Sequence, residues 1–173
     1  MFMHLLIYGF GPYLGFHDNV TEKIVRKLPK RRWLKKVIFP VRFHRSQFIN
    51  AIKAYDPDVI LGLGQCSRGR LLRIESTAIN KRRNSKSEKA RRIAADSSRR
   101  LSTNLKLSLG RQARSSKDAG EYVCNYSMYV ILDFLKRRRL PIRYGFIHVP
   151  RGYDPRKATR ILKKAMGDIG QEG

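Results

Sequence analysis

The chain has 173 residues, 42% of them hydrophobic, which is enough for one domain with an apolar core and hardly enough for two. Lys and Arg number 38 against 13 Asp and Glu, and the resulting formal net charge of +25 predicts attraction to polyanions and excludes an ordinary acidic protein. Two cysteines are too few for a disulfide framework or a four-cysteine zinc site, and no apolar run approaches the roughly 20 residues of a membrane-spanning helix.

Strand-like and helix-like patterns alternate over the first 80 residues. Helices are indicated by apolar residues at helical spacing, and strands by short β-branched or aromatic runs. Residues 2–16 are largely apolar, but no basic region precedes them and glycines interrupt them, so an export signal is not indicated and we expect a cytoplasmic protein with both thiols reduced. In chain order we predict a strand at 3–8, a helix at 20–28, a strand at 37–43, a helix at 46–55, a strand at 59–61 and strand-like stretches within 71–79.

Residues 81–117 differ in kind from the rest of the chain. They contain 13 Lys and Arg but only two acidic residues, together with many serines and scattered apolar residues that follow no period. Like charges repel along such a segment, and little apolar area is available to fix it. We therefore expect a basic loop or a partly helical insertion that is mobile at the surface.

The last third of the chain resumes the alternation, with a helix predicted at 124–135, a strand at 142–149 and a helix at 155–169. Alternating strands and helices are typical of an α/β fold. We expect a single domain spanning residues 1–173, in which helices cover both faces of a mostly parallel sheet in three α/β/α layers. Ligands of such folds bind beyond the carboxyl ends of the strands.

Cys124, at the start of the predicted helix 124–135, is a candidate nucleophile. A helix N-terminus presents unpaired N–H groups and a partial positive charge, which favour the reactive thiolate form of cysteine. Gly120, a few residues earlier, would let the backbone approach a substrate closely. The plainer interpretation is a small buried residue, since free cysteines are often buried.

A nucleophilic cysteine needs a base and a group that orients the base. His148 lies near the end of a predicted strand, where its side chain can face a site. Acidic residues are so scarce that Glu75, in the apolar stretch 71–79, is the notable candidate for the third group. Both residues have plainer interpretations: His148 as a hydrogen-bonded core imidazole, and Glu75 as a carboxylate that faces water or pairs with Arg73. Spacing alone does not join the three residues.

Four blocks follow one another along the chain: YGFGPY at 8–13, GQ at 64–65 with RIESTAIN at 73–80, AGEYVCNY at 119–126, and GFIHVP at 145–150. Together they resemble the pyroglutamyl peptidase I family, also called pyrrolidone carboxyl peptidases, which are cysteine peptidases. Residues 39–41 also fit a strand of that family. The resemblance covers most of residues 3–80 and 115–166.

The resemblance implies that the protein removes N-terminal pyroglutamyl residues from peptides, without a metal or organic cofactor and without a membrane. It assigns Cys124 as the nucleophile, His148 as the base and Glu75 as the residue that orients the base. Homo-oligomer formation remains open. Positions similar to the family's substrate pocket are held by Phe10, Tyr13, Gln65 and Tyr122.

The sequence departs from the family between Glu75 and Cys124. This stretch is shorter than in the family, and KRRNS at 81–85 stands where the family has an Asp-Ala-Arg-Ile-Pro-Asp-Asn-like motif. We therefore expect a reduced helix and strand before Cys124. The departure bears on substrate affinity and oligomer contacts more than on the three catalytic candidates.

A second interpretation is a catalytically impaired relative whose basic surface binds nucleic acid. Basic clusters at 30–36 and 136–139 add to segment 81–117, and phosphate contacts need little beyond such charge. Against it, no known nucleic-acid-binding motif occurs, and a solvated basic surface explains the same residues. We rank the peptidase first and expect any polyanion binding to be weak and independent of sequence.

Overall fold

The structure is a computed structural model that describes residues 3–13 and 15–171. Its central sheet has the strand order β2 (Leu34–Phe39), β1 (Leu5–Phe10), β3 (Val59–Cys66), β8 (Arg143–Pro150), β4 (Leu72–Glu75) and β7 (Ala113–Ser116). The first four strands are parallel, β4 is antiparallel to β8, and β7 is parallel to β4. The mostly parallel sheet predicted from the sequence is confirmed, with a reversed pair of strands at one edge.

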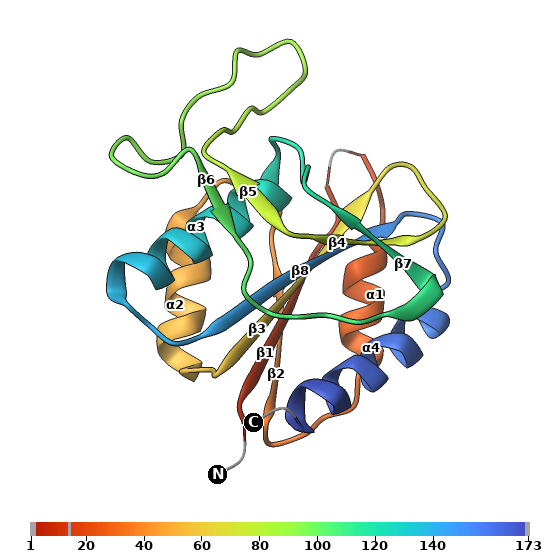
Figure 1. Ribbon diagram of the computed structural model, residues 1–173. Helices are drawn as coiled ribbons and strands as arrows, with labels where there is room; N and C mark the ends of the chain where they lie inside the picture. Colours follow the sequence, from red (N-terminus) through yellow and green to blue (C-terminus); the bar gives the residue numbers. More distant parts are fainter. Residues whose placement is uncertain (1–2, 14, 172–173) are drawn as a thin grey trace.

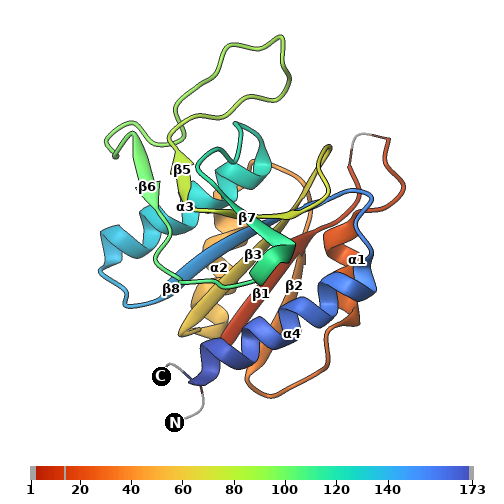
Figure 2. The same ribbon diagram turned by 45° about the vertical axis from the view of Figure 1, so that its right-hand side comes forward.

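Helices cover both faces of this sheet (Figures 1 and 2). One layer contains α1 (Val20–Lys27) and α4 (Pro155–Gln171), which contact each other, and the other contains α2 (Arg45–Tyr55) and α3 (Val123–Arg138). The predicted three-layer α/β/α architecture is therefore confirmed. Among the described residues, no helix combines the length and apolar character needed to cross a membrane.

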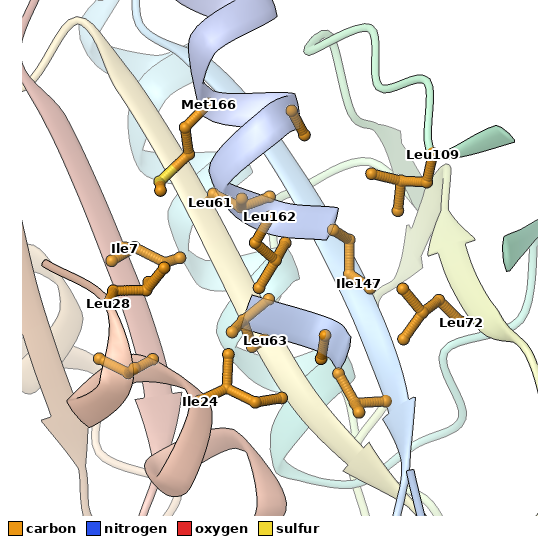
Figure 3. Close-up of a cluster of buried hydrophobic side chains, with 14 of the residues drawn as sticks. Ile7, Ile24, Leu28, Leu61, Leu63, Leu72, Leu109, Ile147, Leu162 and Met166 are labelled. Carbon is orange, nitrogen blue, oxygen red and sulfur yellow. The ribbon is translucent and has the colours of Figure 1, made fainter. Parts of the chain in front are cut away.

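Alternate residues of the central strands supply two separate cores. Because successive side chains of a strand point to opposite faces, Leu61 and Leu63 of β3 face α1 and α4, whereas Ile60 faces α2 and α3. Figure 3 shows the first core, in which Leu162 and Met166 of α4 lie among the side chains of the sheet. Burial on both faces explains why these strands are nearly continuous apolar runs in the sequence.

Two strand predictions need correction. The strand expected at 37–43 is β2, which begins earlier and ends before Pro40, a residue without an N–H for the sheet ladder. Lys35 and Lys36 obscure its start, because an edge strand carries charged residues that a central strand does not. The stretch 71–79 divides into β4 and β5 (Thr77–Ile79), and β5 pairs with β6 (Arg100–Ser102) in a separate antiparallel sheet.

Segment 81–117 is mainly loop. Its only helical feature within the described residues is the 3₁₀ turn η1 (Gly110–Gln112), so the partly helical alternative is wrong. The residues between β5 and β6 extend away from the sheet as an open loop (Figure 1). Asn80 fixes the base of this loop, since its side chain accepts hydrogen bonds from the N–H groups of Ile93 and Ala94. The mobility of the loop stays a prediction.

A buried carboxylate on α3 ties this loop to the helical layer. Asp133 is 2% exposed and accepts hydrogen bonds from Ser97 Oγ, from Arg137 Nε at 3.0 Å and from Arg45 Nη2 at 3.3 Å. Burial alone would raise the pKa of this carboxyl, but the bonds from Ser97 and Arg137 hold the pKa below its usual value. The ionised form of Asp133 therefore stabilises the fold.

We expect Asp133→Asn to lower the free energy of unfolding by about 1–3 kcal/mol, because an amide loses part of the charge-assisted bonding. The folded pKa is lower than the unfolded one, so this contribution is present above about pH 4 and is lost as the pH falls through the folded value. Urea unfolding should show a deficit near pH 7 that shrinks toward pH 3. The exposed Asp168→Asn is the matched control, and an equal deficit in both variants would contradict the assignment.

Candidate active site

The antiparallel pairing of β4 with β8 brings Glu75 and His148 together. Arg73 lies opposite His148 in the register and Glu75 lies opposite Phe146, so these side chains share one face of the sheet. Glu75 Oε1 is 2.7 Å from His148 Nδ1, and both residues are buried, Glu75 completely. Glu75 therefore does not face water. It also pairs with Arg73, whose Nε lies 3.3 Å from the same Oε1 atom that contacts His148.

The contact with Glu75 determines which ring nitrogen of His148 can act as a base. A carboxylate oxygen only accepts hydrogen bonds, so Nδ1 donates its hydrogen and Nε2 keeps its lone pair. The ring of Phe146 packs edge-on against the imidazole, with 5.2 Å between centroids. His148 is thus held in one tautomer and one orientation.

Cys124 reaches the same face of the sheet from the first turn of α3. Gly64 of β3 lies opposite His148 of β8, and a Cβ at Gly64 would be 2.5 Å from Cys124 Sγ. The sulfur therefore occupies the space that a side chain at Gly64 would fill. Gly64 lies on β3, the strand that pairs with β8, which carries His148. Cys124, His148 and Glu75, far apart in the sequence, lie together in the fold.

Burial controls the acidity of Cys124. Desolvation raises the pKa of the thiol to about 12, the charges of Cys66 and Glu75 act in the same direction, and Arg73 acts against them. The sequence predicted that the start of a helix would make the thiol more acidic, whereas desolvation shifts the pKa in the opposite direction. The resting thiol is protonated at neutral pH, so a base must remove its proton.

A hydrogen-bonded network beneath Cys124 was not predicted. Ser127 Oγ donates to the carbonyl oxygen of Cys124 at 2.8 Å and lies 2.9 Å from Tyr8 Oη, which is 2.7 Å from Tyr144 Oη. In the sequence both tyrosines are simply apolar strand residues, and only the need of a buried hydroxyl for a partner could have pointed to the network. It fixes the first turn of α3 to β1 and β8.

Two of the four predicted pocket residues remain accessible to a ligand. Tyr122 immediately precedes α3 and is 40% exposed. Tyr13 is half-buried in the loop after β1; its pKa is raised first by burial and next by the charge of Cys124, which places it near the thiol.

The other two predicted pocket residues, Phe10 and Gln65, make contacts within the fold. Phe10 is 1% exposed and packs edge-on against Tyr8 in the core, with ring centroids 5.8 Å apart. The Gln65 side chain points to the other face of the sheet, where Oε1 accepts a hydrogen bond from the Val20 N–H at the start of α1. The Gln65 side chain also lies near the Tyr13 hydroxyl, whose pKa it lowers.

A cleft of about 640 Å³ opens beside Tyr122 and is large enough for part of a peptide. An ion pair between Arg83 and Glu121 forms part of its wall. Among the described residues, no group of three or more His, Cys, Asp or Glu side chains gathers where a metal ion could be held. The cleft is lined by Ile79, Arg83, Arg100, Lys117, Asp118, Gly120, Glu121 and Tyr122.

We expect Gly64→Ala to displace Cys124. The new methyl group would lie 2.5 Å from the sulfur and 2.7 Å from the Phe146 ring, so the free energy of unfolding should fall by about 1–3 kcal/mol. Gly11→Ala is the control, because nothing lies closer than 3.9 Å to its Cβ. Urea unfolding together with iodoacetamide labelling of Cys124 measures both effects. Identical behaviour of the two variants would show that the sulfur does not occupy this space.

Comparisons with known proteins give one consistent answer. The family model described as pyroglutamyl peptidase matches residues 99–167. The pyrrolidone-carboxylate peptidase of Lactobacillus acidophilus is 31% identical over 168 residues, covering 86% of this chain and 84% of its own length. That of Oceanobacillus iheyensis is 27% identical over 184 residues, covering 95% of this chain and 92% of its own.

Solved structures agree with the sequence comparisons. The pyrrolidone carboxyl peptidase from Thermococcus litoralis has a TM-score of 0.86 at 21% identity, covers 98% of this chain and 94% of its own, and supports the fold alone. The pyroglutamyl peptidase I from Bacillus amyloliquefaciens has a TM-score of 0.80 at 25% identity, covering 98% of this chain and 93% of its own. Because it is 31% identical to a relative over 86% of its own length and 84% of that relative's, the chain belongs to the pyroglutamyl peptidase I, or pyrrolidone carboxyl peptidase, family.

Proposed function

We propose that the protein hydrolyses the bond after an N-terminal pyroglutamyl residue of a peptide, with Cys124 as nucleophile, His148 as base and Glu75 as the residue that orients the base. The single observation that carries this proposal is the buried contact between Glu75 of β4 and His148 of β8, together with the Cys124 sulfur packed against Gly64 on the neighbouring strand β3. The family relationship supports the same activity.

Acylation begins with proton transfer. His148 Nε2 accepts the thiol proton of Cys124, and the thiolate attacks the carbonyl carbon of the pyroglutamyl residue. Glu75 stabilises the imidazolium through Nδ1–H. His148 then gives the proton to the leaving amine, which departs with the rest of the peptide and leaves a thioester on Cys124. Since the thiol is protonated at rest, this transfer is part of the barrier.

The first turn of α3 supplies donors for the oxyanion. The first intrahelical donor of α3 is the N–H of Tyr126, which bonds to the Tyr122 carbonyl oxygen, so the N–H groups of Val123 and Cys124 have no acceptor within the helix. Within the described residues, the side chain of the capping residue Tyr122 makes no capping hydrogen bond either. Such donors contribute roughly 3–4 kcal/mol each to related acyl transfers. Water then attacks the thioester, His148 takes its proton, and pyroglutamate leaves as the thiol reforms.

The substrate is a peptide with a small, uncharged lactam ring at its N-terminus. Tyr13 and Tyr122 are the aromatic side chains left accessible for that ring, and the cleft beside Tyr122 would receive the following residues. The free thiols of Cys66 and Cys124 suit a cytoplasmic location, which is part of the proposal.

Cys124→Ala should abolish hydrolysis of a pyroglutamyl fluorogenic amide, and His148→Ala should slow it by about 10²–10⁴-fold, because the proton has no acceptor. Glu75→Gln should do less harm than His148→Ala, since the base remains but is poorly oriented. Cys66→Ala is the matched thiol control and should retain activity. A wild-type protein that does not hydrolyse the amide, or a His148→Ala variant at the wild-type rate, would reject the mechanism.

A second candidate function, nonspecific nucleic-acid binding, is favoured by one observation. Two basic clusters far apart in the sequence meet, since Arg137 Nη2 donates to the Asp96 carbonyl oxygen at 3.1 Å and Lys136 Nζ donates to Ser98 Oγ at 3.2 Å. The resulting basic surface consists of the exposed residues Arg91, Arg92, Arg99, Arg100, Lys136, Arg137, Arg138 and Arg139.

Binding to this basic surface should be independent of sequence and should weaken steeply with salt, because it would arise from counterion release. The double variant Arg99→Glu with Arg138→Glu should weaken binding of DNA and RNA far more than Lys163→Glu with Lys164→Glu, which makes the same charge change on α4. A salt series measured by fluorescence anisotropy provides the test. Sequence-selective binding that survives high salt, without amide hydrolysis, would promote nucleic-acid binding to the main function.

A further inference from the structure

Arg73 contacts both members of the Glu75–His148 pair, yet the proposed mechanism gives it no part. Its Nε lies 3.3 Å from Glu75 Oε1, and its Nη2 lies 3.3 Å from His148 Nδ1. The side chain is only 25% exposed, so water screens its charge incompletely. The Arg73 guanidinium, the Glu75 carboxylate and the His148 imidazole therefore contact one another.

His148 Nδ1 cannot hydrogen-bond to both neighbours. It either donates to the carboxylate at 2.7 Å or accepts from the guanidinium at 3.3 Å. The shorter contact, to the anion, prevails, so a guanidinium N–H faces the ring N–H of His148. This contact opposes protonation of the ring, because an imidazolium would place a second positive charge beside Arg73.

Glu75, in turn, depends on a nearby cation. The residue is completely buried, and in the described part of the chain its Oε2 has no hydrogen-bond partner. An ionised carboxylate in such a place is costly unless another charge compensates it. Two groups are available for that: the permanent charge of Arg73, and a proton on His148.

We propose that Arg73 is a positioning residue that balances the charge of Glu75, so that His148 stays a neutral base. The inference rests on the proposed function, in which His148 must be unprotonated to accept the thiol proton. Without Arg73, the Glu75 anion would face His148 alone, and the pair would take up a proton at higher pH as a carboxylate–imidazolium pair.

Two thiols are further titratable groups near this cluster. Cys66 lies at the end of β3 and Cys124 at the start of α3, and desolvation raises the pKa of both. Both are therefore uncharged near neutral pH and cannot replace Arg73 as the counter-charge. Arg73 also lowers the pKa of Cys124, so its loss would make the thiol harder to deprotonate as well.

Arg73→Met tests the proposal, because it removes the charge and keeps an unbranched side chain. NMR of histidine-labelled protein should show the His148 titration moved to higher pH by about 1–3 pH units, and the acid limb of kcat/KM should move in the same direction. Arg73→Lys should keep the titration near that of the wild type, because the charge remains, but lower kcat. Arg70→Met, an exposed neighbour with the same charge change, should shift neither.

An unchanged His148 titration in folded Arg73→Met, or an equal shift in Arg70→Met, would overturn the proposal. If Arg73→Met does not fold, Arg73→Lys decides: a His148 titration displaced by about a full pH unit or more would show that charge alone is not what Arg73 provides. The NMR titration needs no turnover. A wild-type protein without peptidase activity would therefore reject the proposed function, while this inference would still be tested separately.

Discussion

The hydrogen bond between Glu75 and His148 depends on the reversed direction of β4. In the antiparallel register, Arg73 is directly opposite His148 and Glu75 is on the diagonal, where only a long side chain can reach across. The short Nδ1–Oε1 contact shows that it does so. β7 then covers the outer side of β4, and residues 81–117 must return to the sheet to form it. Although segment 81–117 is shorter than in the family, it still supplies the edge strand β7.

The second constraint is the close approach of α3 to β3. A Cβ at Gly62 would lie 2.5 Å from the rings of Tyr8 and Phe146, and one at Gly64 would meet Cys124 Sγ. The aromatic rings fill the layer between helix and sheet, and the absence of two side chains lets the sulfur lie beside His148. The same contact also leaves Cys124 only partly exposed, and desolvation raises the pKa of its thiol. In the proposed mechanism the thiolate is therefore formed by the base and is not present beforehand.

Much of this arrangement could be predicted from the sequence. Hydrophobic periodicity located the helices and most strands. The resemblance of four local blocks to a known family singled out Cys124, His148 and Glu75 as candidates, which spacing alone did not join. The direction of β4 could not be predicted, since it depends on which strand it pairs with. The orientation of the Gln65 side chain could not be predicted for a related reason: on β3, alternate residues face opposite layers, and Gln65 shares a face with Leu61 and Leu63.

Charge links the site to the rest of the molecule. Several of the few acidic residues are already paired, as Glu75 is with Arg73 and Asp133 with Arg137, so the excess of 25 positive charges lies mainly at the surface. A positive potential favours the negative charges that the proposed reaction develops, first on the sulfur and then on the oxyanion. The same potential disfavours the imidazolium that must form on His148. Glu75 stabilises the imidazolium through their direct contact, and in our proposal the charge of Arg73 limits that stabilisation. For the protonation of His148, the basic surface and Arg73 therefore act in one direction and Glu75 acts in the other.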